Sequence, residues 1–499
     1  MIVNRKPKLI LTHSKIYLSD FPESILRLVK HEMSVQIAEP GYRVFRGQEN
    51  AFKARFWEGV VCLLKNGNEL PSGLYRRVSR LLSKWGADFE LEDRRIRPDE
   101  PLPRWSFPAH FALRDYQEHA VNLALEKGQG VIDSPPRTGK TIMIAEICRR
   151  ISDLTVIVSP TIEIAKQTHQ KLCELLGHAE EWSSLGDSHA DFYLLTGGAP
   201  KNRLEEQAFK RAIVISSTIN SALKLSSEFW EKVQCLIVDE RHHQASESYR
   251  RLNDLAINAY WRFGFTGTNY RSSPSEHIFL EACLSDVIVS YSIKDMIARE
   301  VLVPSTVLFY PMDLPRRLSA RGNFNALYTR GIVGCTERNY LIRDIAHDLL
   351  NQRYRVLILV DWIAHGKKLN DLITDSVFIK GASGDAIKGV LQDLDSGKVR
   401  CVIGSPVVGE GLDIPAADAV IYAKGLKAKV THTQDIFRVL TAHGQKRRAL
   451  IIDFCDRHQP ALLEHASQRL KNYLLMGCEI KVLDNCRTFK VDPQLRLTR

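Results

Sequence analysis

The sequence lacks three features that would organise it in a special way. Its ten cysteines stand singly from Cys62 to Cys486, with no CxxC pair and no Cys/His cluster at zinc spacing, which favours buried reduced thiols over a disulfide framework. No apolar run reaches the roughly 18–20 residues that cross a bilayer. The N-terminal residues show no signal-peptide pattern. We therefore expect a cytoplasmic protein that makes no membrane contact.

Positive charge is present in excess and is unevenly distributed. The net charge is +11 over 499 residues, and residues 1–105 hold 19 Lys/Arg against 13 Asp/Glu, an excess of six. This asymmetry favours a polyanionic partner near the N-terminus, although a solvated basic face would give the same count. The length predicts about three domains.

Short β-branched runs alternate with helical patterns in two series. They lie at 155–160, 212–217, 235–240 and 262–268, and again at 355–361, 376–381, 400–405, 419–424 and 449–454. Each series predicts a parallel sheet covered by helices. We predict an α/β chain with a small α+β domain at 1–105, one parallel-sheet domain at 106–300 and a second at 301–499.

The basic N-terminal segment predicts an amphipathic helix from about Ser72 to Trp85. Its apolar face would hold Leu74, Val78, Leu81 and Trp85, and its outer face Arg76, Arg77, Arg80 and Lys84. Arg77, Arg80 and Lys84 are candidates for contacts with nucleic-acid phosphates. The alternative is a small packed subdomain whose aromatic residues are simply its core.

The stretch SPPRTGKT (134–141) follows a β-like run and precedes a helical pattern. Such a strand–turn–helix unit aims backbone N–H groups at phosphates. Lys140 would add a charge at the β- and γ-phosphates, and the Thr141 hydroxyl would hold Mg²⁺. Because Ser134 stands where glycine is usual, a Pro-rich turn that contains GKT is the alternative.

The stretch VDERHH (238–243) ends a predicted strand with two adjacent carboxylates. Asp239 suits the water shell of a Mg²⁺ ion, and Glu240 suits the orientation and deprotonation of an attacking water. A solvated acidic pair is the alternative. Metal binding by His242 and His243 is disfavoured, because adjacent side chains point apart and no third ligand is near.

Three further segments carry candidate nucleotide-binding residues. In RDYQ (114–117), Gln117 could read adenine while Arg114 and Tyr116 frame the ring, although this tetrapeptide is also an ordinary helix start. In SPVVGEGLD (405–413), Gly409 allows a close backbone approach and Asp413 can bind a ribose or an arginine. Gln434 and Arg438 lie one helical turn apart, and Arg438 suits an arginine finger.

In this order, RDYQ, SPPRTGKT, SPTIEIAKQ, TGG, SST, VDERHH, FTGT, GEGLD and QDIFRVL resemble the motifs of superfamily-2 helicases and translocases over residues 111 to about 455. The resemblance implies two RecA-like parallel-sheet domains in tandem, with ATP and Mg²⁺ bound between them. Ser134 and Gly139 then belong to the phosphate loop, and Lys140, Thr141, Asp239 and Glu240 carry hydrolysis.

The same resemblance implies roles at the DNA. His242 and Gln434 would link the ATP site to the cleft, and Thr266 and Thr268 would transmit its state. The residues expected to grip the backbone of one strand are Thr161, Gly197, Gly198 and Thr218.

Residues 42–86 resemble the front domain of phage UvsW-type DNA helicases, with RFWEG (55–59) and LPSGL (70–74) at the matching positions. This implies an ATP-dependent helicase or branch-migrating translocase, working on duplex, branched or forked DNA in recombination, repair or replication. A phage-encoded chain would act in the host cytoplasm. The alternatives are a DNA-binding clamp that scarcely hydrolyses ATP, and the motor of a restriction system.

The last family signature departs from its usual form, Q-x-x-G-R-x-x-R. Phe437 stands for the glycine and Thr441 for the second arginine, while Arg438 is kept. Arg447 and Arg448 do not have the spacing to replace it. Loss of a finger can cost about 10³-fold or more in turnover, so the departure predicts slow hydrolysis.

Overall fold

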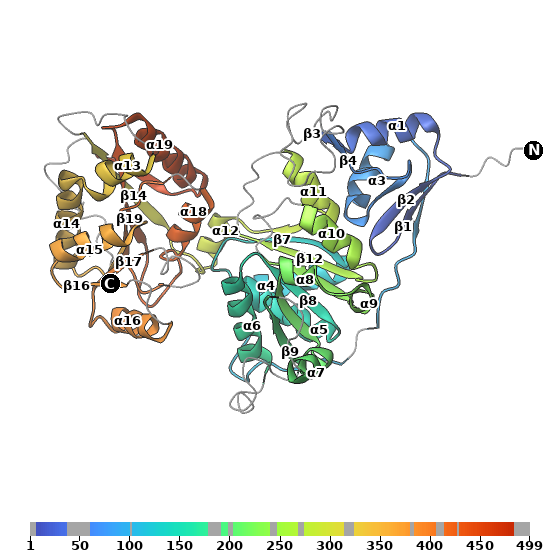
Figure 1. Ribbon diagram of the computed structural model, residues 1–499, viewed down its shortest axis with the longest axis horizontal. Helices are drawn as coiled ribbons and strands as arrows, with labels where there is room; N and C mark the ends of the chain where they lie inside the picture. The colour runs from blue at the N-terminus through green and yellow to red at the C-terminus, as the bar shows by residue number, and fades with distance from the viewer. Residues whose placement is uncertain are drawn as a thin grey trace, which may run out of the picture. The chain divides into compact units, whose positions relative to one another are not determined.

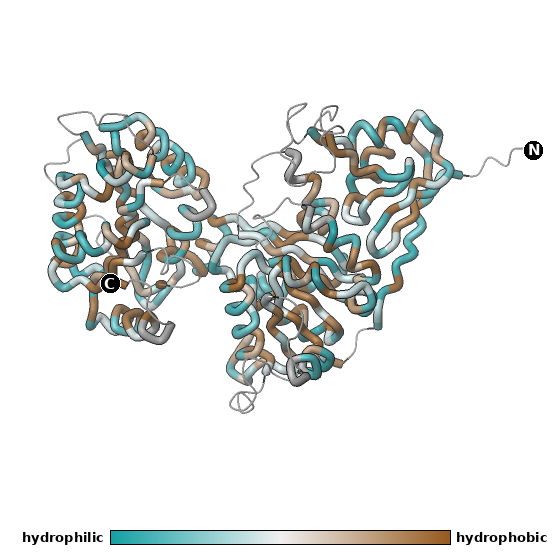
Figure 2. The backbone as a smooth tube through the Cα atoms, in the orientation of Figure 1, coloured by the Kyte–Doolittle hydropathy of each residue, from teal (hydrophilic) through white to brown (hydrophobic). Residues whose placement is uncertain are grey.

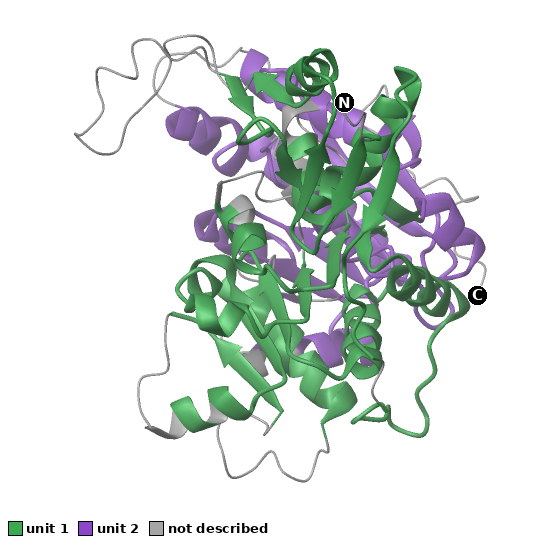
Figure 3. Ribbon diagram, turned by 90° about the vertical axis from the view of Figure 1, so that its right-hand side faces the viewer, with its two compact units in different colours: residues 1–134, 139–290 green, residues 135–138, 291–499 purple. Residues whose placement is uncertain are grey.

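The computed structural model describes residues 6–36, 60–99, 102–177, 191–197, 203–239, 247–267, 274–313, 324–379, 384–405, 414–426 and 429–483. The chain divides into two compact units, unit 1 with residues 1–134 and 139–290, and unit 2 with residues 135–138 and 291–499 (Figure 3). Residues 1–105, predicted as an N-terminal domain, lie in unit 1, and the predicted domain boundaries stay a prediction.

The N-terminal part of unit 1 is a small α+β layer (Figure 1). One sheet has the order β5-β2-β1-β6, and β3 pairs with β4. The elements are β1 (Lys8–Leu11), β2 (Lys15–Ser19), α1 (Glu23–Glu32), β3 (Ser34–Gln36), β4 (Val60–Cys62), β5 (Glu69–Pro71), η2 (Ser72–Leu74), α3 (Tyr75–Lys84) and β6 (Glu90–Asp93). The predicted amphipathic helix is confirmed, since Leu74 and Val78 are fully buried and Leu81 and Trp85 pack partly against the same core.

This layer packs against α11 (Pro274–Leu284). Ile278 and Ala282 of α11 belong to the same apolar core as the N-terminal strands. Gly73 lies so close that a Cβ there would stand 2.1 Å from the carbonyl oxygen of Glu281 and 2.6 Å from that of Ala282. Only a glycine permits this backbone approach, which explains the glycine of LPSGL.

Gly73→Ala is therefore expected to destabilise unit 1. The atoms in the way are backbone oxygens, which cannot swing aside, so the strain should cost about 1–3 kcal/mol and lower the thermal midpoint by several degrees. Gly389→Ala is the control, because its Cβ would meet open space. Equal midpoints for the two variants in a thermal melt would contradict the close packing on α11.

Unit 1 also holds a seven-stranded, all-parallel sheet of order β13-β7-β12-β11-β8-β10-β9. α4, α5 and α6 cover one face and α8 to α11 the other (Figure 1). Its elements are α4 (Asp115–Lys127), β7 (Gln129–Asp133), α5 (Lys140–Ile151), β8 (Thr155–Ser159), α6 (Ile162–Leu176), β9 (Phe192–Leu195), α7 (Arg203–Arg211), β10 (Val214–Thr218), α8 (Ile219–Ala222), α9 (Ser227–Trp230), β11 (Cys235–Val238), α10 (Glu247–Leu255), β12 (Trp261–Thr266) and β13 (Val287–Ser290).

Unit 2 holds a second all-parallel sheet of seven strands, in the order β16-β17-β15-β18-β19-β14-β20. α14 and α15 pack on one face and α19 on the other. Its elements are α12 (Ile293–Ala298), β14 (Ser305–Met312), α13 (Phe324–Tyr328), η5 (Thr329–Val333), α14 (Thr336–Asn351), β15 (Val356–Leu359), α15 (Ile363–Leu372), β16 (Ser376–Ile379), α16 (Gly384–Ser396), β17 (Cys401–Gly404), β18 (Ala419–Tyr422), α18 (Lys429–Phe437), β19 (Ala449–Asp456), α19 (Pro460–Leu475) and β20 (Glu479–Val482).

The predicted fold class is confirmed: two parallel sheets follow one another behind a small α+β layer. Each of the nine predicted β-branched runs forms a strand. Figure 2 marks the hydrophobic residues along the chain in brown. The prediction missed β9, β13, β14 and β20. β14 had no counterpart among the predicted runs, yet it lies between β19 and β20, and seven of its eight residues are buried.

Candidate functional site

The candidate site of unit 1 lies at the carboxyl edge of its sheet. The strand registers place Thr266 beside Asp133, Val238 beside Val158, and Thr218 beside Ser159. Because all these strands are parallel, the segments that follow β7, β8, β10, β11 and β12 emerge at the same edge. Ligands of open parallel sheets bind there.

The loop 134–139 joins β7 to α5 and begins with a buried serine. The Ser134 N–H donates to the Thr266 carbonyl at 2.9 Å, and its side chain is fully buried. Arg137 and Gly139 both adopt left-handed backbone, with φ of +72° and +80°. α5 then begins at Lys140, so the loop ends at a helix N-terminus, where anions are favoured. The predicted strand–turn–helix unit is present with serine in the first position.

Gln117 packs behind this loop. The Arg114 N–H donates to Gln117 Oε1 at 3.0 Å, which closes the start of α4. A Cβ on Gly139 would stand 2.4 Å from Gln117 Nε2, so the amide fills the space that the glycine leaves. Gln117 therefore supports the loop, and adenine recognition by Arg114 and Gln117 stays a prediction.

Asp239 directly follows β11 and is buried. Its N–H donates to the Val158 carbonyl at 2.9 Å, and its Oδ2 accepts from the Thr168 hydroxyl at 3.3 Å. Thr168 lies on the buried side of α6, two turns after the capping residue Thr161. The sequence analysis missed Thr168, because a threonine in a helix carries no motif. Glu240, His242 and Thr268 lie outside the described residues.

Three of the residues expected to bind the backbone of one DNA strand lie at the same edge of the sheet. The Thr161 hydroxyl caps α6 by accepting from the Ile164 N–H at 3.3 Å. The Thr218 hydroxyl accepts from the Ser221 N–H at 3.4 Å, and Ser221 Oγ accepts from the Gly197 N–H at 2.8 Å. Ser221, which the sequence analysis missed, thus joins Gly197 to Thr218. Gly198 is not among the described residues.

Arg77 and Arg80, nominated for DNA, both have acidic partners inside unit 1. Arg77 Nε donates to Glu281 at 2.9 Å, and Arg80 forms an ion pair with Asp286. Burial raises the pKa of Glu281, while the hydrogen bond from Arg77 opposes that rise. A phosphate would have to compete with these carboxylates, so Lys84, which is exposed at the end of α3, is the better remaining candidate.

In unit 2, Arg438 directly follows α18 and is buried. Its Nη1 lies 3.3 Å from Asp435 Oδ1, and Asp435 in turn binds Lys424. Gln434 is half-buried on the same helix. Gly409 and Asp413 fall in a stretch that the structure leaves undescribed.

The structure also describes the two residues that depart from the last family signature, Phe437 and Thr441. Phe437 is buried in the interior of unit 2, and the backbone of Thr441 pairs with Leu302. Two arginines, Arg447 and Arg448, lie shortly after the signature. Arg448 donates a hydrogen bond to the Thr306 hydroxyl at 2.6 Å and forms an ion pair with Glu479. Arg448 is therefore engaged at the β14–β20 side of the sheet.

No three His, Cys, Asp or Glu side chains gather as metal ligands within the described ranges. Over the same part of the chain, no helix is both long and apolar enough to cross a membrane.

Comparison with known proteins agrees with this arrangement. Residues 110–271 match the family model described as "Type III restriction enzyme, res subunit". The chain is 22% identical over 473 residues to the ATP-dependent DNA helicase uvsW of phage T4, which covers 86% of this chain and 91% of that protein. It is 24% identical over 412 residues to the DNA 3'-5' translocase XPB2 of Sulfurisphaera tokodaii, covering 74% and 87%. In its motif order and in these relatives the chain is similar to superfamily-2 helicases and translocases.

A solved structure supports the fold. The DNA-bound, ATP-dependent Type ISP restriction-modification enzyme LlaBIII matches with a TM-score of 0.52 at 15% identity, over 75% of this chain and 31% of that one. The chain therefore shares its fold with part of a larger enzyme.

Proposed function

We propose that the chain is an ATP-dependent DNA helicase or translocase that acts on duplex or branched DNA in recombination, repair or replication. The observation that carries the proposal is the carboxyl edge of the first sheet. There the phosphate loop, Asp239 and the segments that carry Thr161, Gly197 and Thr218 emerge together. An ATP-binding site and a binding site for one DNA strand on the same edge of the sheet suit a protein that couples ATP hydrolysis to movement along DNA.

The residues at this edge fit a nucleotide with its metal. Because Gly139 has no side chain, the loop can pack directly against Gln117. Lys140 is the first residue of α5. Lys140 binds the β- and γ-phosphates, Thr141 and Asp239 hold Mg²⁺, and Glu240 accepts a proton from the attacking water. ATP supplies the phosphoryl bond whose hydrolysis drives movement.

The second unit contributes the remaining nucleotide contacts of the proposal. Gly409 and Asp413 follow β17, and Gln434 and Arg438 lie on or just after α18. Arg438 stabilises the negative charge that develops on the transferred phosphoryl group.

The DNA contacts follow the strand ends. Thr161, Gly197, Gly198 and Thr218 bind the phosphates of one strand. Gly197 has φ of +110° and open space beside its Cα, which allows a backbone to approach closely. Lys84 adds a phosphate contact from the N-terminal layer.

A restriction motor is the second candidate, favoured by the description of the matching family model and by the likeness to LlaBIII. Seven relatives named as helicases or translocases favour the first candidate.

ATP turnover with no DNA, single-stranded, duplex and forked DNA tests the proposal, together with strand displacement on a fork. We expect DNA to stimulate turnover and a fork to be remodelled only with ATP. A chain that binds DNA with ATP but neither hydrolyses it nor moves would instead be a clamp. Stimulation by RNA alone would overturn the assignment to DNA.

Thr168→Val is expected to raise the Mg²⁺ concentration needed for half-maximal turnover. The substitution keeps the shape of the side chain but removes the hydroxyl that orients Asp239. Loss of such an outer contact typically costs about 10–100-fold in metal affinity. Thr168→Ser keeps the hydroxyl and should behave as wild type in the same Mg²⁺ titration. Identical Mg²⁺ dependence for Val and Ser would show that Thr168 only packs.

A further inference from the structure

A lysine in the interior of unit 2 pairs with acids from two different elements. Lys424 follows β18, Asp361 follows β15, and Asp435 lies on α18. The ammonium of Lys424 donates to Asp435 Oδ2 at 2.7 Å and lies 3.9 Å from Asp361 Oδ1. The side chains of Lys424 and Asp435 are 3% and 1% exposed, so water screens this pair very little.

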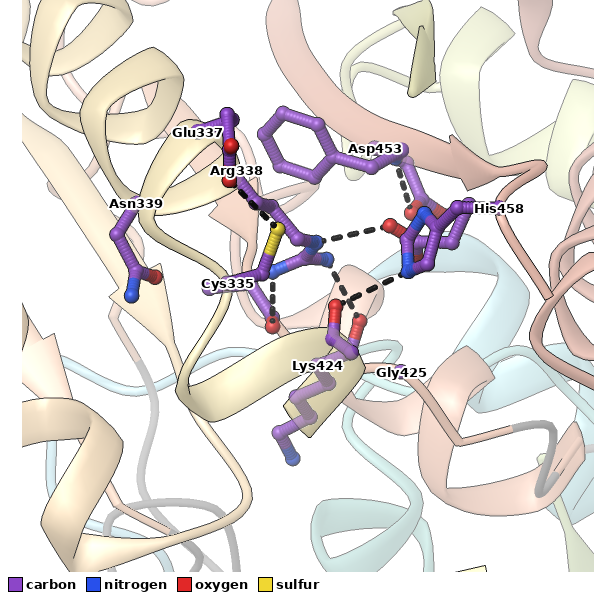
Figure 4. A network of polar contacts seen from close by, with 12 residues as sticks. Cys335, Glu337, Arg338, Asn339, Lys424, Gly425, Asp453 and His458 are labelled. Atoms are coloured by element: carbon purple, nitrogen blue, oxygen red, sulfur yellow. Dashed lines mark hydrogen bonds and ion pairs between the residues drawn. The ribbon is translucent and has the colours of Figure 1, made fainter. Parts of the chain in front are cut away.

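The backbone that carries Lys424 is fixed as well. Arg338, at the start of α14, donates to the carbonyls of Ala423 at 2.9 Å and Lys424 at 3.3 Å, and it pairs with Asp456 at 3.0 Å (Figure 4). Lys424 is thus held at its carbonyl as well as at its ammonium.

The next residue along the chain is anchored in the same way. The Gly425 N–H donates to the Tyr328 hydroxyl at 3.1 Å, and that hydroxyl donates to Asp361. Asp361 is therefore tied to the loop after β18 through Tyr328, besides its charge contact with Lys424. Lys424 is therefore held in place by its neighbours, and a side chain held in this way can position a partner with little further loss of conformational freedom.

The two oxygens of Asp435 are used differently. Oδ2 receives the hydrogen bond from Lys424, whereas Oδ1 has no hydrogen-bond partner within the described chain, although Arg438 Nη1 lies 3.3 Å away. The contact with Arg438 is therefore a charge attraction without hydrogen-bond geometry. Burial raises the pKa of Asp435, and the positive charges of Lys424 and Arg438 oppose that rise.

We propose that Lys424 is a positioning residue for Arg438. By binding Asp435 firmly, Lys424 prevents this carboxylate from closing on Arg438 as a bidentate ion pair, which would occupy the donors of the guanidinium. Asp435 then stays at its 3.3 Å contact with Arg438 Nη1 and does not form the bidentate pair. The inference rests on the proposed function, in which Arg438 acts on ATP.

Turnover of the full chain with ATP, Mg²⁺ and DNA tests this role. We expect Lys424→Met to lower kcat on the order of 10–100-fold, as for a displaced catalytic group, with the KM for ATP little changed. Lys424→Arg keeps the cation and should retain most of the turnover. The double variant Lys424→Met/Asp435→Asn removes the captured charge together with its partner and should regain much of the lost kcat.

Arg469→Met is the matched control, because it also removes a fully buried cation of unit 2, one that pairs with Asp453. It should lower the thermal midpoint but leave kcat unchanged in the folded fraction. A Lys424→Met variant as fast as wild type, or a double variant as slow as the single one, would overturn the positioning role alone. A wild-type chain with no ATPase activity would overturn the proposed function and this inference together.

Discussion

Lys140→Ala is expected to abolish ATP hydrolysis by weakening ATP binding. Lys140 begins α5 at the end of the loop 134–139, so its removal takes away the charge that we propose for the β- and γ-phosphates. Glu240→Gln is expected to bind ATP and yet stall, since the amide cannot accept the proton of water. General-base catalysis typically contributes about 10²–10⁴-fold.

Nucleotide binding and turnover measured side by side separate the two effects. Lys127→Ala is the control, because Lys127 is a lysine at the far end of α4 that pairs with Glu126. It should bind and hydrolyse ATP as wild type does. Wild-type turnover in purified Lys140→Ala or Glu240→Gln would show that the loop 134–141 is not the hydrolytic site.

Arg438→Ala is expected to reduce turnover by about 10³-fold or more while sparing ATP binding. It removes the only arginine of the last signature at a finger spacing, and Arg448 pairs with Glu479 in the structure. Thr441→Arg is expected to raise turnover, because it restores a cation at the position where the family usually has one.

The buried position of Phe437 decides how this is tested. Phe437→Gly would remove a side chain that is only 1% exposed and would cost about 3–5 kcal/mol, so the loss of stability would obscure any gain. Thr441→Arg should therefore be measured alone and compared with Thr441→Lys. Normal turnover in Arg438→Ala would mean that the helix is wrongly aligned to the family signature and that Arg447 is the next candidate.

The sequence by itself determined the two parallel sheets and the edge where the site lies. Periods of apolar residues and the turns between them are local properties, and nine predicted runs became strands for this reason. The parallel order then brought the loop 134–139, Asp239, Thr161 and Thr218 to one edge, because carboxyl ends of parallel strands coincide.

Only the tertiary structure decided which side chains support the site and which are used elsewhere. Thr168 meets Asp239 across 71 residues, and Arg77 meets Glu281 across 204. Such pairs have no local signature. The sequence does not distinguish an arginine that pairs with a distant carboxylate from one that binds a phosphate. Lys424 is the clearest case: it follows a strand like any other loop residue, and only the tertiary structure places its charge between Asp361 after β15 and Asp435 on α18.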